Sequence, residues 1–310
     1  MTGAILVTGA AGFIGSALLR HLGGLGAGPV VALDLRPGPD LPGVTWVQGD
    51  IRDPALAGLF IRHRPAVVVH LASVVAAGGD AARDYTIDVE GTANIAGAAL
   101  ACGARRLVVT SSGAAYGCHP DNPVPLTESC ALRGNENFPY SRHKRLVEEH
   151  LAELRRAYPG LEQVIFRPCT VLGPGVRNQI TAIFERPVVT GLSGNATPFS
   201  FIADEDVVAA LVRATADGPP GIYNLAGDGT VSLRDIAQAL GKPFLGLPPA
   251  VMRGAIGALR ALRLTRLEPA QVAFIQYRPV LDNTALKRDF GFTPRHSSRA
   301  AFDRYARGLK

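Results

Sequence analysis

The chain has 310 residues, of which 47% are hydrophobic and 19% charged, and its net charge is +6. That length and apolar content predict one large α/β unit or two smaller domains around a substantial buried core. No apolar run reaches the roughly 18 residues that cross a membrane, and the first strand-like run starts too near residue 1 for a signal peptide. We therefore expect a soluble, cytoplasmic protein. The four cysteines show no CxxC pair and no metal-ligand spacing, so we expect reduced thiols and no metal site.

Short apolar runs alternate with helical patterns along the first half of the chain. The run at 4–10 ends in a glycine turn that opens a helical pattern at 12–26, and the next run, at 29–34, ends in an acid. This order predicts a β-α-β unit. We expect further strands and helices at 44–50, 66–73, 90–104, 106–112, 140–158 and 163–168. Apolar strands that alternate with helices predict a parallel sheet covered on both faces, which is a doubly wound α/β fold of the Rossmann type.

The alternation weakens after Pro168, where connections rich in proline and glycine appear. We therefore predict a first domain at 1–168 and a smaller α/β region at 169–310 that binds the substrate. The segment 201–216 combines an acidic start with a helical apolar stripe, so we expect it to pack back onto the first domain.

Positive charge is concentrated near the C-terminus. Residues 251–310 contain 12 Arg and Lys against 4 Asp and Glu, a balance of +8 that leaves −2 for the rest of the chain. No basic motif interleaved with aromatic residues is present, so we expect a phosphate-bearing small molecule or a solvated surface rather than a nucleic acid. The stretch 248–269 has the pattern of a membrane-surface helix, but we expect it to pack on its own domain and predict no membrane partner.

Three glycines between the first strand and the first helix indicate a cofactor site. Gly9, Gly12 and Gly15 form GxxGxxG, which lets the backbone approach a pyrophosphate at the positive end of the helix. Asp34 ends the second strand 19 residues after Gly15, where its carboxylate can accept hydrogen bonds from both ribose hydroxyls. A carboxylate there repels a 2′-phosphate, so we predict NAD as the cofactor, although Arg36 would soften that preference.

Two further patterns are candidates for chemistry. Tyr140 and Lys144 stand four residues apart on one face of the expected helix, where the ammonium favours a phenolate that can act as a base. Taken alone, such a pair is more often a surface contact. The stretch RLVVTSSGAAYG, at 106–117, indicates a strand that ends in a turn of small residues, and its serines can cap that turn or carry chemistry.

The order of these motifs resembles the short-chain dehydrogenase/reductase superfamily, and specifically its extended, NAD-dependent epimerase/dehydratase branch. The resemblance covers nearly the whole chain and includes GDIRD at 49–53, VVHLAS at 68–73, the helix and strand at 89–108, and RPCTVLGPG at 167–175. It implies that Ser112 is the catalytic serine, that Tyr140 is the acid/base, and that Lys144 activates the tyrosine and holds the nicotinamide ribose.

The same resemblance implies two sets of binding residues. Those for the cofactor are Gly9, Gly12, Phe13, Ile14, Gly15, Asp34, Asp50, Ile51, Leu71, Ala72, Ser73, Tyr140, Lys144 and Pro168. Those for the substrate are Ser112, Thr170, Arg177 and Arg278.

Several positions depart from the family's pattern. Gly113 and Ala114 follow the catalytic serine where the 4,6-dehydratases carry an Asp-Glu pair, so dehydration does not fit. Phe199 stands where a phosphate-binding Arg is common, and Arg278 lies near the place of the family's second such Arg. Asp88 replaces an Asn that orders the catalytic region.

Three histidines, His70, His119 and His143, lie close to these motifs. His119 follows the Tyr-Gly turn at the expected mouth of the site, but we do not count it as a site residue. We expect His70 to be a strand residue satisfied by its neighbours, and His143 to lie on the exposed side of the helix that carries Tyr140.

Together these features predict an NAD-dependent sugar-nucleotide epimerase that acts at the 4-position through a transient 4-keto intermediate. The enzymatic alternative is an NAD-dependent dehydrogenase or reductase of a sugar or another secondary alcohol. The non-enzymatic alternative is an NAD-sensing regulator on the same fold. The resemblance also implies a homodimer formed through the helices that contain 92–101 and 140–151.

Overall fold

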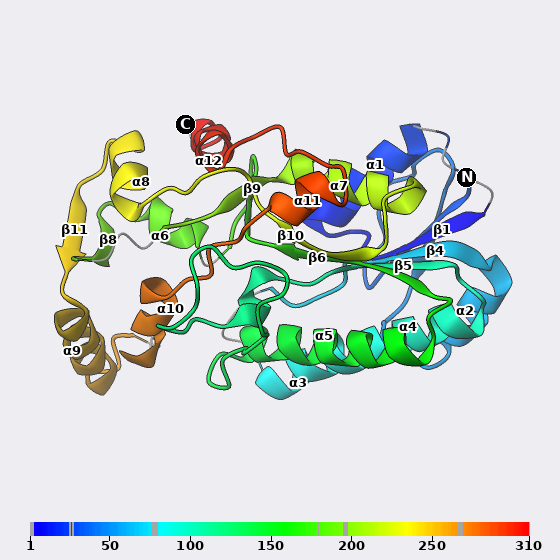
Figure 1. Cartoon of the computed structure of the whole chain (residues 1–310), viewed down its shortest axis with the longest axis horizontal. Coiled ribbons are helices and arrows are strands. Elements are labelled where there is room, and N and C mark those ends of the chain that lie inside the picture. The colour runs from blue at the N-terminus through cyan, green and yellow to red at the C-terminus, as the bar shows by residue number, and fades with distance from the viewer. Residues whose placement is uncertain are drawn as a thin grey trace.

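A seven-stranded parallel sheet forms the centre of the molecule, with the strand order β10-β6-β5-β4-β1-β2-β3 (Figure 1). The computed structural model describes residues 3–309 apart from 25, 27, 76–79, 179, 195–197 and 266–268. The strands of the sheet are β1 (Ala4–Thr8), β2 (Val30–Asp34), β3 (Val44–Gln48), β4 (Pro65–His70), β5 (Arg106–Thr110), β6 (Glu162–Pro168) and β10 (Gly221–Leu225). The parallel sheet predicted from the alternating sequence pattern is therefore confirmed.

The chain builds this sheet outward from β1 in two directions. β2 and β3 lie on one side of β1, while β4, β5 and β6 lie on the other, so the strand order reverses between β1 and β4. Doubly wound sheets bind their ligands at such a reversal, beyond the carboxyl ends of the strands. The seventh strand, β10, comes from beyond residue 168 and is not among the expected strands. The division of the chain at residue 168 stays a prediction.

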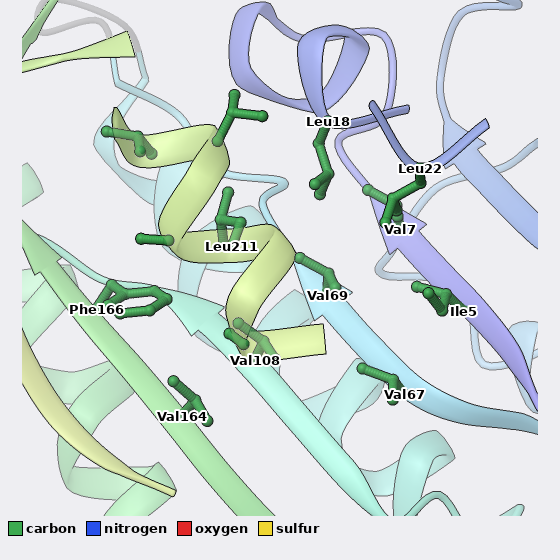
Figure 2. Packing of buried hydrophobic residues seen from close by; sticks show 14 of the residues in the cluster. Ile5, Val7, Leu18, Leu22, Val67, Val69, Val108, Val164, Phe166 and Leu211 are labelled. Carbon is green, nitrogen blue, oxygen red and sulfur yellow. The ribbon is translucent and has the colours of Figure 1, made fainter. Parts of the chain in front are cut away.

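Helices cover both faces because successive side chains of a strand point to opposite sides. Ile5 and Val7 of β1 pack in one cluster with Leu18 of α1 (Phe13–Gly24) and Leu211 of α7 (Asp204–Ala216), as Figure 2 shows. Leu6, between them, packs in the opposite cluster. Burying each such side chain contributes about 1.5–3 kcal/mol to stability. The segment 201–216 therefore supplies a helix that covers the sheet.

The remaining helices and turns of the part of the chain that contains the main sheet cover its other face or connect its strands. They are α2 (Leu56–His63), α3 (Ala81–Tyr85), the π-helical turn η1 (Thr86–Glu90), α4 (Gly91–Ala101), the 3₁₀ turn η2 (Gly113–Tyr116) and α5 (Pro139–Ala157). Figure 1 shows α3, α4 and α5 together below the sheet.

A smaller α/β region lies at one end of the molecule (Figure 1). It contains two short parallel strand pairs, and its core is rich in aromatic rings such as Phe184, Phe201 and Phe302, which pack edge-on or stacked. Its elements are β7 (Thr170–Leu172), α6 (Thr181–Glu185), β8 (Val189–Leu192), β9 (Phe201–Ala203), α8 (Leu233–Ala239), β11 (Phe244–Leu247), α9 (Pro249–Ala261), η3 (Pro269–Gln271), α10 (Val272–Gln276) and α12 (Ser298–Arg307), while α11 (Thr284–Arg288) lies by the main sheet.

Helix α9 is the basic helix that we expected to pack on its own domain. It does so along one edge only, because Met252 is buried and Ile256 partly buried, whereas Val251, Leu259 and Leu262 are exposed. No helix in the described part of the chain is long and apolar enough to span a bilayer.

His70, at the end of β4, is satisfied by its neighbours as predicted. Its Nδ1 lies 2.7 Å from Thr8 Oγ1 and its Nε2 lies 3.0 Å from Thr92 Oγ1. Burial, with a smaller effect of the Lys144 charge, lowers the pKa of His70 to about 3. The imidazole is therefore neutral across the physiological pH range.

Replacing His70 with Gln tests this burial. The unfolded imidazole has a pKa of about 6.5, so below that pH only the unfolded chain takes up a proton and the free energy of unfolding falls by about 1.4 kcal/mol per pH unit. Urea denaturation should show that the wild type loses about 2 kcal/mol more than His70→Gln between pH 7 and pH 5. Equal losses in the two proteins would contradict a buried, neutral His70.

Candidate active site

Most of the predicted cofactor residues, together with Ser112, lie at the carboxyl edge of the sheet, on which the reversal between β1 and β4 also lies. The glycine turn follows β1, Asp34 ends β2, Ser73 follows β4, Ser112 follows β5 and Pro168 ends β6. Because parallel strands all point the same way, their carboxyl ends bring these distant segments to one edge.

The turn after β1 has a shape that only glycine permits. Gly9 has a φ of +67°, and a Cβ there would lie 2.6 Å from the backbone nitrogen of Ala72, in the loop after β4. A Cβ on Gly15 would collide with the carbonyl oxygen of Gly9. Helix α1 begins at Phe13, so its first N–H groups, which have no partner within a helix, face the ligand side of the turn. This cradle fits a pyrophosphate.

Asp34 is held beside that turn. Its Oδ2 accepts a hydrogen bond from the N–H of Ala11 (2.9 Å), and its Oδ1 accepts one from the N–H of Arg36 (3.1 Å). The Arg36 guanidinium in turn donates to the carbonyl oxygen of Ala11 (3.2 Å). The carboxylate is therefore fixed at the end of β2, in the place where a ribose binds in this type of fold.

The segment after β3 extends the site along the same edge. Hydrogen bonds from the Arg52 side chain hold the pKa of the Asp50 carboxyl below its usual value. Ile51 is buried next to them. Asp50 and Arg52, with Thr86 and Glu90, line an open hollow of about 430 Å³.

The two serines after β5 point to different surroundings. Ser111 is buried and donates a hydrogen bond to Glu148 Oε1 (2.6 Å). Ser112 caps η2 by accepting the N–H of Ala114 (3.1 Å), and within the described residues its own hydroxyl donates to no protein group. Ser112 is therefore the serine that is available to a ligand, whereas Ser111 belongs to the interior.

Tyr140 lies in the first turn of α5, next to the segment that contains Ser112. Ser141 donates a hydrogen bond to the carbonyl oxygen of Ala114 (2.6 Å), which joins the start of α5 to η2. Lys144, only 5% exposed, donates to Ser73 Oγ (2.8 Å), and its Nζ lies 5.6 Å from the centre of the Tyr140 ring. The ammonium thus lies between the tyrosine and the loop after β4, and no carboxylate in the described ranges pairs with it.

Arg278 approaches from the smaller region. Its guanidinium donates to Thr170 Oγ1 (3.3 Å) and lies 4.2 Å from the centre of the Phe199 ring. Burial lowers its pKa, and among the residues that the structure describes no carboxylate neutralises it. Phe199, at the position where the resembled family often carries an Arg, therefore supports a different guanidinium.

Arg177 lies apart from this pair. It lines a separate hollow of about 150 Å³ with Glu185 and Tyr305. Nothing in the described structure joins it to Thr170 or Arg278. Of the four expected substrate residues, Thr170 and Arg278 are therefore in contact, whereas Arg177 lies apart from them.

A family model for the NAD dependent epimerase/dehydratase family matches residues 5–226. The chain belongs to this family. Membership makes it an NAD-dependent enzyme of the epimerase/dehydratase type, and the predicted family and cofactor are both confirmed.

Individual relatives agree with the family match. UDP-glucose 4-epimerase of Mycolicibacterium smegmatis is 32% identical over 295 residues, which cover 86% of this chain and 91% of the relative. The structure of UDP-glucose 4-epimerase from Thermotoga maritima with UDP-glucose matches with a TM-score of 0.77 at 22% identity, over 99% of this chain and 98% of that one. MoeE5 in complex with UDP-glucuronic acid and NAD matches with a TM-score of 0.74 at 25% identity, over 99% of both chains.

Sequence reasoning missed a buried ion pair behind the serines of this NAD-dependent epimerase/dehydratase family member. Arg167 of β6 donates to both carboxyl oxygens of Glu148 in α5, at 2.9 and 2.6 Å, and to the hydroxyl of Tyr116 in η2 (2.7 Å). Burial alone lowers the pKa of Arg167, but Glu148 raises it overall. Nothing in the spacing of Glu148 and Arg167 indicates that they meet, because they come together only when α5 packs on the sheet that contains β6.

The prediction for His143 is wrong. This residue is buried rather than exposed, because η1 and the ring of Tyr85 cover that side of α5. Its Nδ1 lies 3.8 Å from Asp88 Oδ2. The helical period identified the side of α5 that carries Tyr140 and Lys144, but it gave no indication of what packs beside it.

Replacing Arg167 with Met tests the importance of the buried ion pair. The change leaves Glu148 buried without a partner, which should lower the free energy of unfolding by about 3–5 kcal/mol. The control Arg145→Met removes ion pairs with the exposed Glu136 and Glu149, and should cost no more than about 1 kcal/mol. Urea denaturation measures both, and equal losses would contradict a special role for the buried pair.

Proposed function

We propose that the protein is a nucleotide-sugar 4-epimerase. The observation that carries the proposal is the grouping of Ser112, Tyr140 and Lys144 beside the glycine turn, with Gly113 and Ala114 rather than acidic residues directly after the serine. The 4-epimerase named among its relatives supports this reading.

The chemistry follows from what each side chain can do. NAD, held by the glycine turn and Asp34, would supply a reversible hydride acceptor beside the substrate carbinol carbon. Tyr140 takes the proton of the substrate hydroxyl while the C–H bond breaks, and gives it back when the hydride returns to the other face of the ketosugar. Ser112 donates a hydrogen bond to the reacting oxygen. Lys144 supplies a fixed positive charge 5.6 Å from the centre of the Tyr140 ring and would donate to the cofactor's ribose.

The residues after Ser112 make dehydration unsuitable. Gly113 and Ala114 offer no carboxyl group to protonate a leaving hydroxyl or to remove a neighbouring proton. Leu281 packs directly against Gly113, where an added Cβ would lie 2.9 Å from its Cδ1. An acidic side chain at position 113 would therefore displace Leu281.

Arg278 supports a substrate that carries phosphate. A partly buried guanidinium with no carboxylate partner in the described chain is a favourable site for an anion, and a diphosphate can accept bidentate hydrogen bonds from it. We therefore assign Thr170 and Arg278 to the nucleotide end of the substrate. Arg177 has no place in this arrangement.

One observation favours the alternative, a dehydrogenase of a less polar secondary alcohol. Phe138 lies next to Tyr140, with ring centres 6.1 Å apart, and stacks on Phe274 of α10 at 4.7 Å. This places an apolar wall beside the reacting group. The epimerase keeps NAD and shows no net reduction, whereas the dehydrogenase reduces added NAD in proportion to substrate.

We also propose a homodimer formed through α4 and α5. Ala93, Gly97 and Ala101 stand four residues apart on α4, and an added Cβ on Gly97 would meet open space. Such small residues allow a second copy to approach closely.

Conversion of UDP-, GDP- and dTDP-sugars, followed by chromatography of the products, tests the proposed activity. Tyr140→Phe should lower kcat by about 10²–10⁴-fold because it removes the acid/base group. Tyr158→Phe, a change on the exposed end of the same helix, is the control and should leave the rate unchanged. An active Tyr140→Phe enzyme would contradict the assignment.

The two candidate arginines give a separate test of the substrate class. Arg278→Leu should raise KM for the converted sugar nucleotide by about tenfold or more, because it removes a charged contact with the diphosphate. Arg177→Leu is the matched control and should leave KM unchanged. The opposite result would move the phosphate site to Arg177, and a dehydrogenase acting on an uncharged alcohol would be affected by neither change.

A further inference from the structure

Two ionisable side chains that the proposed chemistry does not use face each other in the interior. Asp88 lies in the π-helical turn η1, and His143 lies in α5 directly before Lys144. Each residue is 2% exposed, and Asp88 Oδ2 lies 3.8 Å from His143 Nδ1. Short π-helical segments are rare in proteins, and those that occur are often found at functional sites.

The other carboxyl oxygen of Asp88 fixes the segment that positions Lys144. Oδ1 accepts the backbone N–H of Val74 (2.9 Å), and the preceding residue, Ser73, accepts the hydrogen bond from Lys144 Nζ (2.8 Å). The carbonyl oxygen of Asp88 accepts a further hydrogen bond from Thr92 (2.5 Å), which ties η1 to α4. Asp88 and Lys144 are therefore hydrogen-bonded to two consecutive residues, Val74 and Ser73.

The facing atoms of the pair have no other partners. Neither Asp88 Oδ2 nor His143 Nδ1 has a hydrogen-bond partner among the described residues, although both are buried. Buried polar atoms are rarely left unsatisfied because each then loses its hydrogen bonds to water. A hydrogen on Nδ1 that points to Oδ2 satisfies both atoms once the two side chains approach by about 1 Å.

The charges around His143 favour this arrangement. Burial has the largest effect and lowers the pKa of His143, Arg142 lowers it further, and the carboxylates of Asp84 and Asp88 raise it. The Tyr85 ring covers the imidazole edge-on, with ring centres 5.6 Å apart. The overall direction is downward, which favours the neutral imidazole beside Asp88.

We propose that Asp88 and His143 form a buried positioning pair for Lys144. Adjacent side chains on a helix diverge by about 100°, so His143 joins α5 to η1 while Lys144 reaches Ser73. Asp88 connects the two contacts of α5. One of its oxygens faces His143, and the other accepts the N–H of Val74, next to Ser73. The inference shares one element with the proposed function, namely that Lys144 binds the ribose of NAD.

Three variants and one control test the pair. Asp88→Ala removes both contacts, and His143→Asn withdraws the imidazole, so each should weaken NAD binding and lower kcat about tenfold through displacement of Lys144. Asp88→Asn keeps an oxygen for the N–H of Val74 and should remain within about threefold of wild type. His150→Asn, two turns along α5, is the matched control and should change neither quantity.

The affinity for NAD, measured by calorimetry on the full chain, decides the outcome. If Asp88→Ala and His143→Asn fold, as judged by thermal unfolding, and bind NAD within about twofold of wild type, the pair has only a structural role and the proposal is overturned. If Asp88→Ala does not fold, His143→Asn decides alone. NAD affinity does not depend on the sugar, so a wild-type protein that converts no sugar nucleotide would refute the proposed function and leave this test intact.

Discussion

The geometry of the site depends on the bidentate ion pair between Glu148 and Arg167. Glu148 lies one turn beyond Lys144 and two turns beyond Tyr140, so holding it to β6 fixes the register of the face of α5 that carries both residues. The same carboxylate accepts the hydroxyl of Ser111, which fixes the chain next to Ser112. A buried charge without a partner is costly, so α5 cannot slide or rotate without a large loss of stability. The serine, the tyrosine and the lysine are thereby held in one arrangement.

Two other cations, the buried Lys144 and the partly buried Arg278, have no such partner in the described chain. Lys144 has one hydroxyl partner, Ser73, and Arg278 has one hydroxyl partner, Thr170, together with the face of Phe199. Keeping a cation away from water without an anion costs free energy, which a bound anionic or electron-rich ligand recovers. The neutralised Arg167 stabilises the fold, whereas Lys144 and Arg278 keep charge that a ligand could neutralise, as the proposed function requires.

The sequence predicts the parts of the fold that depend on local pattern. Alternating strands and helices indicate the parallel sheet, and the sequence places the glycine turn and Asp34 at one edge of it. That NAD binds there stays a prediction. Contacts between distant segments carry no such pattern. The environment of His143 depends on η1 and Tyr85, which close over α5 only in the folded chain. The stacking of Arg278 on Phe199 likewise joins two loops that no spacing relates.

Transfer of the substrate hydrogen within the site is the central claim, and isotope retention measures it most directly. UDP-glucose that carries deuterium at the 4-carbon is incubated with the enzyme, and the epimerised sugar is examined by mass spectrometry. If the hydride leaves the carbon and returns to it while Tyr140 carries only the hydroxyl proton, the product keeps the deuterium at the 4-carbon. A product that has lost deuterium to water would contradict the account.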